Sequence, residues 1–108
     1  MGKPQTDDRD LARGLVAGSF SATGASAGII ARGGLNITIS GTFGATVKPR
    51  RSFDGGVTWH FVTTPDGFSD RSHTGPVSYW VYEFEDGVLY SLECTAYSSG
   101  PVAYRLSC

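Results

Sequence analysis

The chain from residue 35 onward alternates apolar and polar residues with a period of two. The pattern is clearest over 35–40, where leucine and isoleucine alternate with asparagine, threonine and serine. Strict alternation is typical of β-strands that bury one face. Six strands joined as consecutive hairpins are therefore predicted over 35–40, 43–51, 57–61, 77–85, 88–97 and 102–108.

The first third of the chain carries a weaker pattern. Residues 1–13 have alternating charges and almost no apolar side chain, so they cannot bury enough surface to offset their ordering entropy. We predict an N-terminal arm there, free in isolation or laid on a partner. Residues 14–34 are small and apolar, which favours one or two edge strands. Residues 14–108 are thus expected to form a single all-β domain, a small antiparallel β-sandwich of immunoglobulin-like size with about six to eight strands. A β-barrel is the alternative closure.

The strongest local signal is the turn between the second and third of these strands. Asp-Gly-Gly at 54–56 favours a tight turn, because glycine adopts positive φ without a Cβ clash. The surrounding residues follow the order Ser-x-Asp-x-Gly-x-Thr-Trp, with Ser52, Asp54, Gly56, Thr58 and Trp59. This order resembles the Asp-box of sialidases and other β proteins. In that family the box is a folding device away from the catalytic centre, so the resemblance implies a structural role here.

Two further connections are predicted to be hairpin turns. Asp86-Gly87 would join 77–85 to 88–97, and an odd-numbered loop at 99–101 would join 88–97 to the last strand. In that register Cys94 faces Tyr104 or Leu106, and Cys108 lies at least one diagonal position away. A disulfide would then be poorly aligned, so buried or half-buried thiols are expected. Pro49 indicates an edge or a bulge, and 65–76 reads as an exposed loop.

Composition and net charge limit the partners that the protein is expected to bind. The 108 residues carry a net charge of −1, so bulk affinity for nucleic acid is not implied. No signal peptide and no membrane-spanning stretch is visible, and no membrane partner is expected. Synthesis in a reducing cytoplasm follows, where paired thiols are not expected.

The charges are unevenly distributed. Residues 32–51 hold four bases and no acid, whereas residues 83–93 hold four acids and no base. These are either two solvated strand faces or two patches that meet between copies. In the second case the patches would close a head-to-tail homo-oligomer such as a trimer, with apolar contact through 77–85. The candidate partner contacts are Lys3, Arg9, Arg13, Lys48, Arg50, Arg51, Tyr79, Glu83 and Glu85.

The residues that could act as catalysts do not form a recognisable set. His60 and His73 are the two neutral bases, and neither has a nucleophile or carboxylate in a known local arrangement. Glu83 and Glu85 share one strand face, as a retaining-type carboxylate pair would, although exposed strand glutamates are far more often solvated. Calcium-loop spacing and phosphate-binding glycine loops are lacking in the sequence. We therefore expect no enzyme activity, no metal and no cofactor.

Several segments resemble small virion structural proteins of tailed bacteriophages and prophages. They are Leu-Asn-Ile-Thr-Ile-Ser-Gly-Thr-Phe at 35–43, Arg-Ser-Phe-Asp-Gly-Gly-Val-Thr-Trp at 51–59, Gly-Val-Leu-Tyr-Ser-Leu-Glu-Cys-Thr-Ala-Tyr at 87–97 and Tyr-Arg-Leu-Ser at 104–107. The resemblance implies a capsid accessory protein located in the virion, assembled in the host cytoplasm. It would act as a decoration or cement protein that binds the outer shell in many copies.

The partner implied by the resemblance is the major capsid protein or another virion protein. Two alternatives remain open. One is a neck or tail accessory protein, and the other is a carbohydrate-binding adhesion module. Such a module would use exposed aromatic residues such as Tyr79 or Tyr97 as stacking platforms.

Overall fold

The computed structural model describes residues 14–64, 67 and 69–108, and the arm predicted at 1–13 lies outside them. Within this part of the chain the protein is all-β, with no helix. The strands are β1 (Leu15–Phe20), β2 (Gly24–Ala25), β3 (Ile29–Ile30), β4 (Gly34–Ser40), β5 (Gly44–Ser52), β6 (His60–Phe61), β7 (Val77–Tyr82), β8 (Leu89–Ser99) and β9 (Val102–Ser107).

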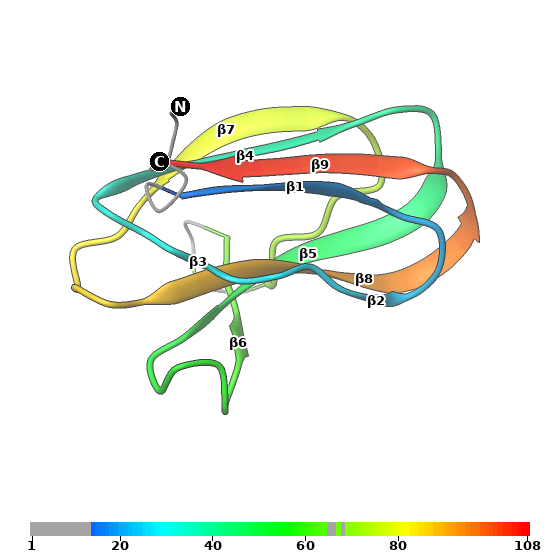
Figure 1. The fold of residues 1–108 in the computed structure, drawn as a ribbon. Coiled ribbons are helices and arrows are strands. Elements are labelled where there is room, and N and C mark those ends of the chain that lie inside the picture. The colour runs from blue at the N-terminus through cyan, green and yellow to red at the C-terminus, as the bar shows by residue number, and fades with distance from the viewer. Residues whose placement is uncertain (1–13, 65–66, 68) are drawn as a thin grey trace.

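These strands form two antiparallel sheets that lie in two layers (Figure 1). The first sheet has the order β1–β9–β4–β7. The second has the order β2–β8–β5–β6, and β3 pairs with β8 as well. The predicted edge strands of the N-terminal third are confirmed, because β1 ends the first sheet and the short β2 and β3 lie beside β8.

The prediction of consecutive hairpins is wrong at four of the five connections. β5 and β6 do form a hairpin, with Arg50 opposite Phe61. The connections from β4 to β5, from β6 to β7, from β7 to β8 and from β8 to β9 instead pass from one sheet to the other. Asp86-Gly87 and Gly100-Pro101 are therefore crossovers between layers. Alternation identifies which face of a strand is buried. It does not distinguish two strands paired in one sheet from two strands in opposite layers, because both bury that face in the same core.

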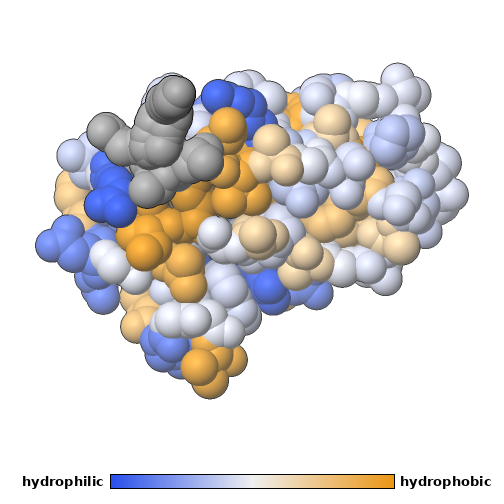
Figure 2. All heavy atoms as spheres, viewed as in Figure 1, coloured by the Kyte–Doolittle hydropathy of each residue, from blue (hydrophilic) through white to orange (hydrophobic). Residues whose placement is uncertain are grey.

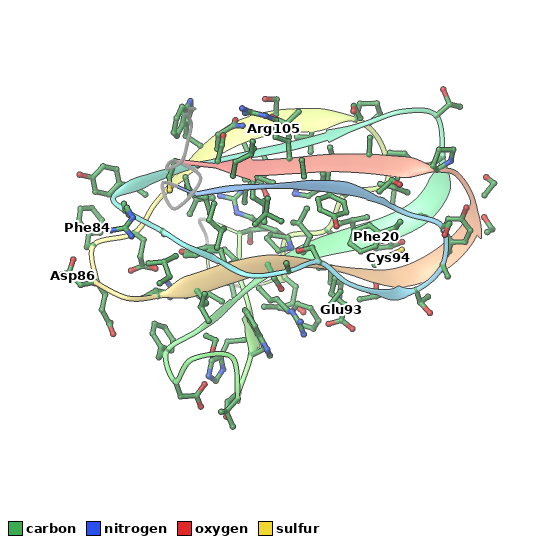
Figure 3. The ribbon with its side chains drawn as sticks, viewed as in Figure 1. Phe20, Phe84, Asp86, Glu93, Cys94 and Arg105 are labelled. Atoms are coloured by element: carbon green, nitrogen blue, oxygen red, sulfur yellow. The ribbon has the colours of Figure 1, made fainter. Side chains whose placement is uncertain are left out.

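The core between the layers follows the predicted alternation. Leu35, Ile37 and Ile39 of β4 are almost fully buried. The same core contains Val88, just before β8, and three alternate residues of β8, together with residues of β5 and β9. The residues of these strands are Tyr90, Leu92, Cys94, Val47, Val102 and Leu106. Phe20 and Cys94 lie between the two layers in Figure 3.

The cysteines are not joined by a disulfide. Cys94 is buried, as expected, but Cys108 is exposed, which corrects the expectation for that thiol. The predicted register of Cys94 opposite Tyr104 or Leu106 is also wrong, because β8 and β9 belong to different sheets. The predicted apolar face of 57–61 is wrong too, since only His60–Phe61 forms a strand and Val57 is 83% exposed.

The segment that follows β6 covers the open edge of β5. The amide of Val62 donates to the carbonyl of Pro49 at 3.0 Å, and His73 exchanges two backbone bonds with Val47. Pro49 has no N–H to return, and the carbonyl of Val62 accepts from Arg71 instead. His73 is thus half-buried, which corrects its placement in an exposed loop. The bulges of β5 precede Pro49, which is itself fully buried.

Candidate functional site

The Asp-box turn is built by side chains that bond to their own backbone. Asp54 Oδ1 accepts from the amides of Val57 at 3.1 Å and Thr58 at 2.8 Å. Ser52 Oγ donates to Asp54 Oδ1 and accepts from the amide of Gly56 at 2.9 Å. These bonds are those of an Asx-type turn.

The turn stabilises structure and holds its own carboxylate in the charged form. The backbone hydrogen bond from Thr58, followed by the bond from Ser52, lowers the pKa of Asp54 to about 2. Trp59 lies under the turn, because a Cβ at Gly56 would be 3.6 Å from Trp59 Cζ2. The guanidinium of Arg50 lies 4.2 Å from the Trp59 ring centroid. The side-chain hydrogen bonds of Ser52 and Asp54 thus have both their partners within the turn.

Glu83 lies at the centre of a buried hydrogen-bonded network. Its Oε1 accepts from Arg51 Nη1 and from the Tyr90 hydroxyl, both at 2.8 Å, and its Oε2 accepts from the Glu85 amide at 3.0 Å. Burial alone would raise the pKa of Glu83, but these three hydrogen bonds outweigh it and lower the pKa. Burial, with the bond to Glu83, raises the pKa of Tyr90 to about 12. Glu83 is therefore charged and fully bonded at neutral pH.

The two charge patches predicted from the sequence meet within one chain. Arg51 pairs with Glu83 at 2.8 Å, Arg50 with Glu93 at 3.5 Å and Lys48 with Asp70 at 3.6 Å. β5 lies beside β8 in the second sheet, and the segment after β7 comes down to Arg51. Contacts of Arg51 and Arg50 with Glu83 and Glu93 inside one molecule were in neither of the two alternatives given for these patches.

The other predicted contact residues have different surroundings. Glu85 is exposed whereas Glu83 is buried, so the expectation of two solvated glutamates on one strand face is wrong for Glu83. Tyr79 is half-buried, and its hydroxyl lies 2.8 Å from His73 Nε2. Burial, with the charge of Arg71, lowers the pKa of His73. Lys3, Arg9 and Arg13 lie outside the described residues.

The exposed apolar surface is an aromatic strip on the outer side of β7 and just beyond it. We define this strip as Trp80, Tyr82 and Phe84, which are 69%, 65% and 89% exposed. The rings of Tyr82 and Phe84 are 4.7 Å apart between centroids. Trp80 lies against the backbone of Gly34, because a Cβ there would be 3.3 Å from Trp80 Cε3. Phe84 lies near Asp86 at one end of the molecule (Figure 3).

The sequence pattern separated the two faces of this strand but did not show which of them is buried. Val77, Tyr79 and Val81 are half-buried on the inner face, although Tyr79 was expected to be exposed. The strand lies at the edge of the first sheet. The candidate contact chosen from it, Tyr79, is on the inner side, and the aromatic strip was missed as a site. The alternation itself was the signal that could have found it.

A cleft separates β7 from β6. It has a volume of about 390 Å³ and is lined by Arg51, Phe53, His60, Phe61, Val62, Thr63, Val81, Tyr82 and Tyr90. Tyr82 belongs to both the cleft and the aromatic strip. The aromatic residues can stack against a flat ligand, and the Arg51 guanidinium can donate hydrogen bonds from the floor.

Other apolar surface is more scattered. Figure 2 shows apolar residues over β1 and β3 and at the tip of the projecting β5–β6 hairpin. Leu15 and Ile30 are exposed in the first area, beside a groove of about 290 Å³, and Val57 is exposed in the connection between β5 and β6. These residues provide controls for the aromatic strip.

The described residues contain neither a cluster of metal ligands nor a membrane-spanning helix. No group of three or more His, Cys, Asp or Glu residues that could hold a metal ion occurs within residues 14–64, 67 and 69–108. No helix long and apolar enough to cross a membrane is found among the described residues. Comparison of the chain with protein-family models, with curated proteins and with solved structures found no match.

Proposed function

We propose that this chain is a non-enzymatic structural protein of a tailed-bacteriophage virion. In this role it binds the outer capsid shell in many copies, as a decoration or cement protein. The layered arrangement of the two sheets supports its assignment to the small antiparallel β-sandwiches. The phage assignment itself rests on the resemblance of the segments at 35–43, 51–59, 87–97 and 104–107.

The observation that carries a binding role is the aromatic strip. Three adjacent, mostly exposed aromatic side chains form a surface beside a rigid strand. Exposed apolar patches of this kind mark interaction sites, and aromatic residues are enriched at the centres of protein interfaces. The partner proposed for the strip is the major capsid protein or another virion protein.

The engagement of the titratable groups supports a non-enzymatic role. Glu83 accepts three hydrogen bonds from its own chain, and the His73 ring is bonded to Tyr79. A general base needs a free acceptor within reach of its substrate. The bonds within the chain occupy both oxygens of Glu83, and Tyr79 lies against Nε2 of His73.

The proposed homo-oligomer has to rest on apolar contacts more than on charge. Arg51 and Glu83, which would have joined neighbouring copies, are bonded to each other. Exposed ion pairs contribute little affinity in any case. These two charges are therefore not available to close a trimer or other ring. The contacts between subunits have to come from the apolar surface of the chain.

A carbohydrate-binding adhesion module, or a neck or tail accessory protein, is the second candidate. The cleft between β6 and β7 favours the adhesion module, because aromatic rings and a guanidinium meet there. Tyr79 and Tyr97 are half-buried and do not provide the stacking platforms expected of them. Tyr82, which lines the cleft, would be the stacking platform for a sugar ring instead.

The copy number of the protein in purified particles tests the proposal. A copy number comparable with that of the major capsid protein is expected for a decoration protein. The copy number of a single ring would indicate the neck or tail, and absence from particles would reject all virion roles. Particles lacking the protein should rebind it, and Phe84→Ser should reduce occupancy while the matched variant Val57→Ser should not. Deletion of residues 1–13, with Lys3, Arg9 and Arg13, should also weaken rebinding.

A further inference from the structure

β7 has an open edge whose backbone hydrogen-bonding pattern can be derived. Glu83 donates from its amide to the carbonyl of Gly33 at 2.8 Å, and the β4–β7 register places these two residues opposite each other. In an antiparallel pair, alternate residues point their N–H and C=O groups at the partner strand. Val77, Tyr79 and Val81 therefore bond to β4, while the residues between them face the open edge.

The outward residues are Ser78, Trp80 and Tyr82. Among the described residues none donates to or accepts from the backbone groups of these three on that side. Proteins usually protect such an edge with lysine, proline or an inward charge, or by covering it. The run Val77–Tyr82 has no charge and no proline. The edge of β5, by contrast, is covered by the segment that follows β6.

The pattern of open groups is symmetric about Trp80. A second copy of β7, antiparallel to the first, would place Trp80 opposite Trp80 and Ser78 opposite Tyr82. Each outward N–H then meets an outward C=O, which is the requirement for a two-fold contact between identical surfaces. No like charges are opposed, because the strand carries none. A second copy of the chain supplies such a strand, which is uncharged and has no proline.

We propose that β7 pairs with β7 of a second copy of this chain about a two-fold axis through Trp80. The two four-stranded sheets then form one continuous sheet of eight strands. The side chains of Ser78, Trp80 and Tyr82 are exposed on one face, so the two tryptophans become cross-strand neighbours. The aromatic strips of the two copies join into one larger apolar surface. The pairing does not depend on the proposed virion role.

Sedimentation equilibrium of the full chain, with Trp80→Glu, tests the dimer. The wild type should dimerise, and the glutamate should raise the dissociation constant at least about tenfold, because two like charges would face each other across the axis. The matched control is Leu15→Glu on β1, which is the other edge of the same sheet and is 45% exposed. It should dimerise like the wild type. A wild type that stays monomeric at about 1 mM, or equal effects of the two variants, would overturn the pairing.

Amide hydrogen exchange tests the register directly. The amides of Ser78, Trp80 and Tyr82 should exchange quickly in dilute protein and slow down as the concentration rises. The amides of Tyr79 and Val81 should stay protected at both concentrations, because they bond to β4. Protection of Trp80 that does not depend on concentration would show that the edge is covered within the chain, and would reject the dimer.

Cross-linking supplies the geometry. In a Cys108→Ser background, Trp80→Cys should form a disulfide-linked dimer, since opposed residues lie at a suitable Cα separation. Ala17→Cys on β1, which is also exposed on an edge strand of the first sheet, is the control and should remain reduced under the same conditions. Equal cross-linking at the two positions would contradict a specific β7 contact.

Discussion

Arg51 and Glu83 join the two layers of the protein through a hydrogen bond of 2.8 Å between Nη1 and Oε1. Arg51 lies on β5 in the second sheet, and Glu83 directly follows β7 in the first. Tyr90 of β8 donates to the same carboxylate oxygen, so three segments converge on one buried group. Arg51 and Tyr90, the two side chains that bond to Glu83, also line the cleft between β6 and β7.

Loss of the Arg51 charge should destabilise the protein. Arg51→Met leaves the buried Glu83 carboxylate without its cation, and we expect the free energy of unfolding to fall by about 1–3 kcal/mol at pH 7. The value lies below that of a fully buried pair because the Arg51 side chain is 39% exposed and solvent screens it. Urea unfolding followed by tryptophan fluorescence measures the change.

Lys48→Met provides the matched control for this experiment. Lys48 lies on the same strand, and its ion pair with Asp70 is longer and more exposed. Its loss should cost less than about 1 kcal/mol. Equal destabilisation by the two variants would show that the Arg51–Glu83 pair has no special part in stability.

Acid should destabilise the protein partly through Glu83. The folded state lowers the pKa of this carboxyl below its ordinary value of 4.5, so the unfolded chain takes up the proton first as pH falls. The stabilisation is complete above about pH 5 and is lost as pH falls through the folded pKa. Melting temperatures across this range should fall less steeply for Glu83→Gln than for the wild type.

Two other groups also make the folded protein less stable as pH falls, but over different pH ranges. Asp54, with its pKa lowered to about 2, contributes at lower pH. His73 contributes at higher pH, because its pKa is lowered from an ordinary value of 6.5. A slope for Glu83→Gln that equals the wild-type slope below pH 5 would therefore contradict the role of Glu83 in acid destabilisation.

The Asp-box turn should contribute to stability and not to binding. Ser52→Ala removes the acceptor of the Gly56 amide at a fully buried position, and the free energy of unfolding should fall by about 1–3 kcal/mol. Asp54→Asn keeps an acceptor oxygen and should melt closer to the wild type than Asp54→Ala does. All three variants should bind virions in the cold. Unchanged melting with abolished binding would reassign the turn as a site.

The two thiols should differ in reactivity. Cys94 is buried in the core, and burial raises the pKa of its thiol, whereas Cys108 is exposed. In the native protein a thiol reagent should therefore label one cysteine per chain quickly, and Cys108→Ser should abolish this fast phase. Fast labelling that persists in Cys108→Ser would place Cys94 in solvent.

Local chemistry made some features predictable. The bonds of the Asp-box join residues at most four positions apart, such as Asp54 and Thr58, so the motif by itself identifies the turn. Alternation likewise identified the buried faces of β4 and β8, because a strand exposes every second side chain to the core. On β7 the same rule placed Tyr79 and Trp80 on opposite faces, but it did not show which of the two faces the core.

Strand pairing and the site next to it depended on the tertiary structure. Alternation states which face of a strand is buried and says nothing of which strand lies beside it, so neighbours such as β7 and β8 were taken for a hairpin although they belong to different sheets. The burial of Glu83 followed from that arrangement, since Arg51 and Tyr90 reach it only because the segment after β7 crosses the gap between the layers. The sequence alone therefore determined the turn and the buried faces of β4 and β8. The packing of two sheets on one core decided that Arg51 and Glu83 meet inside one molecule and that β7 is the last strand of its sheet among the described residues. Several strands share the same alternating pattern, so the pattern does not determine their order or the contacts that depend on it.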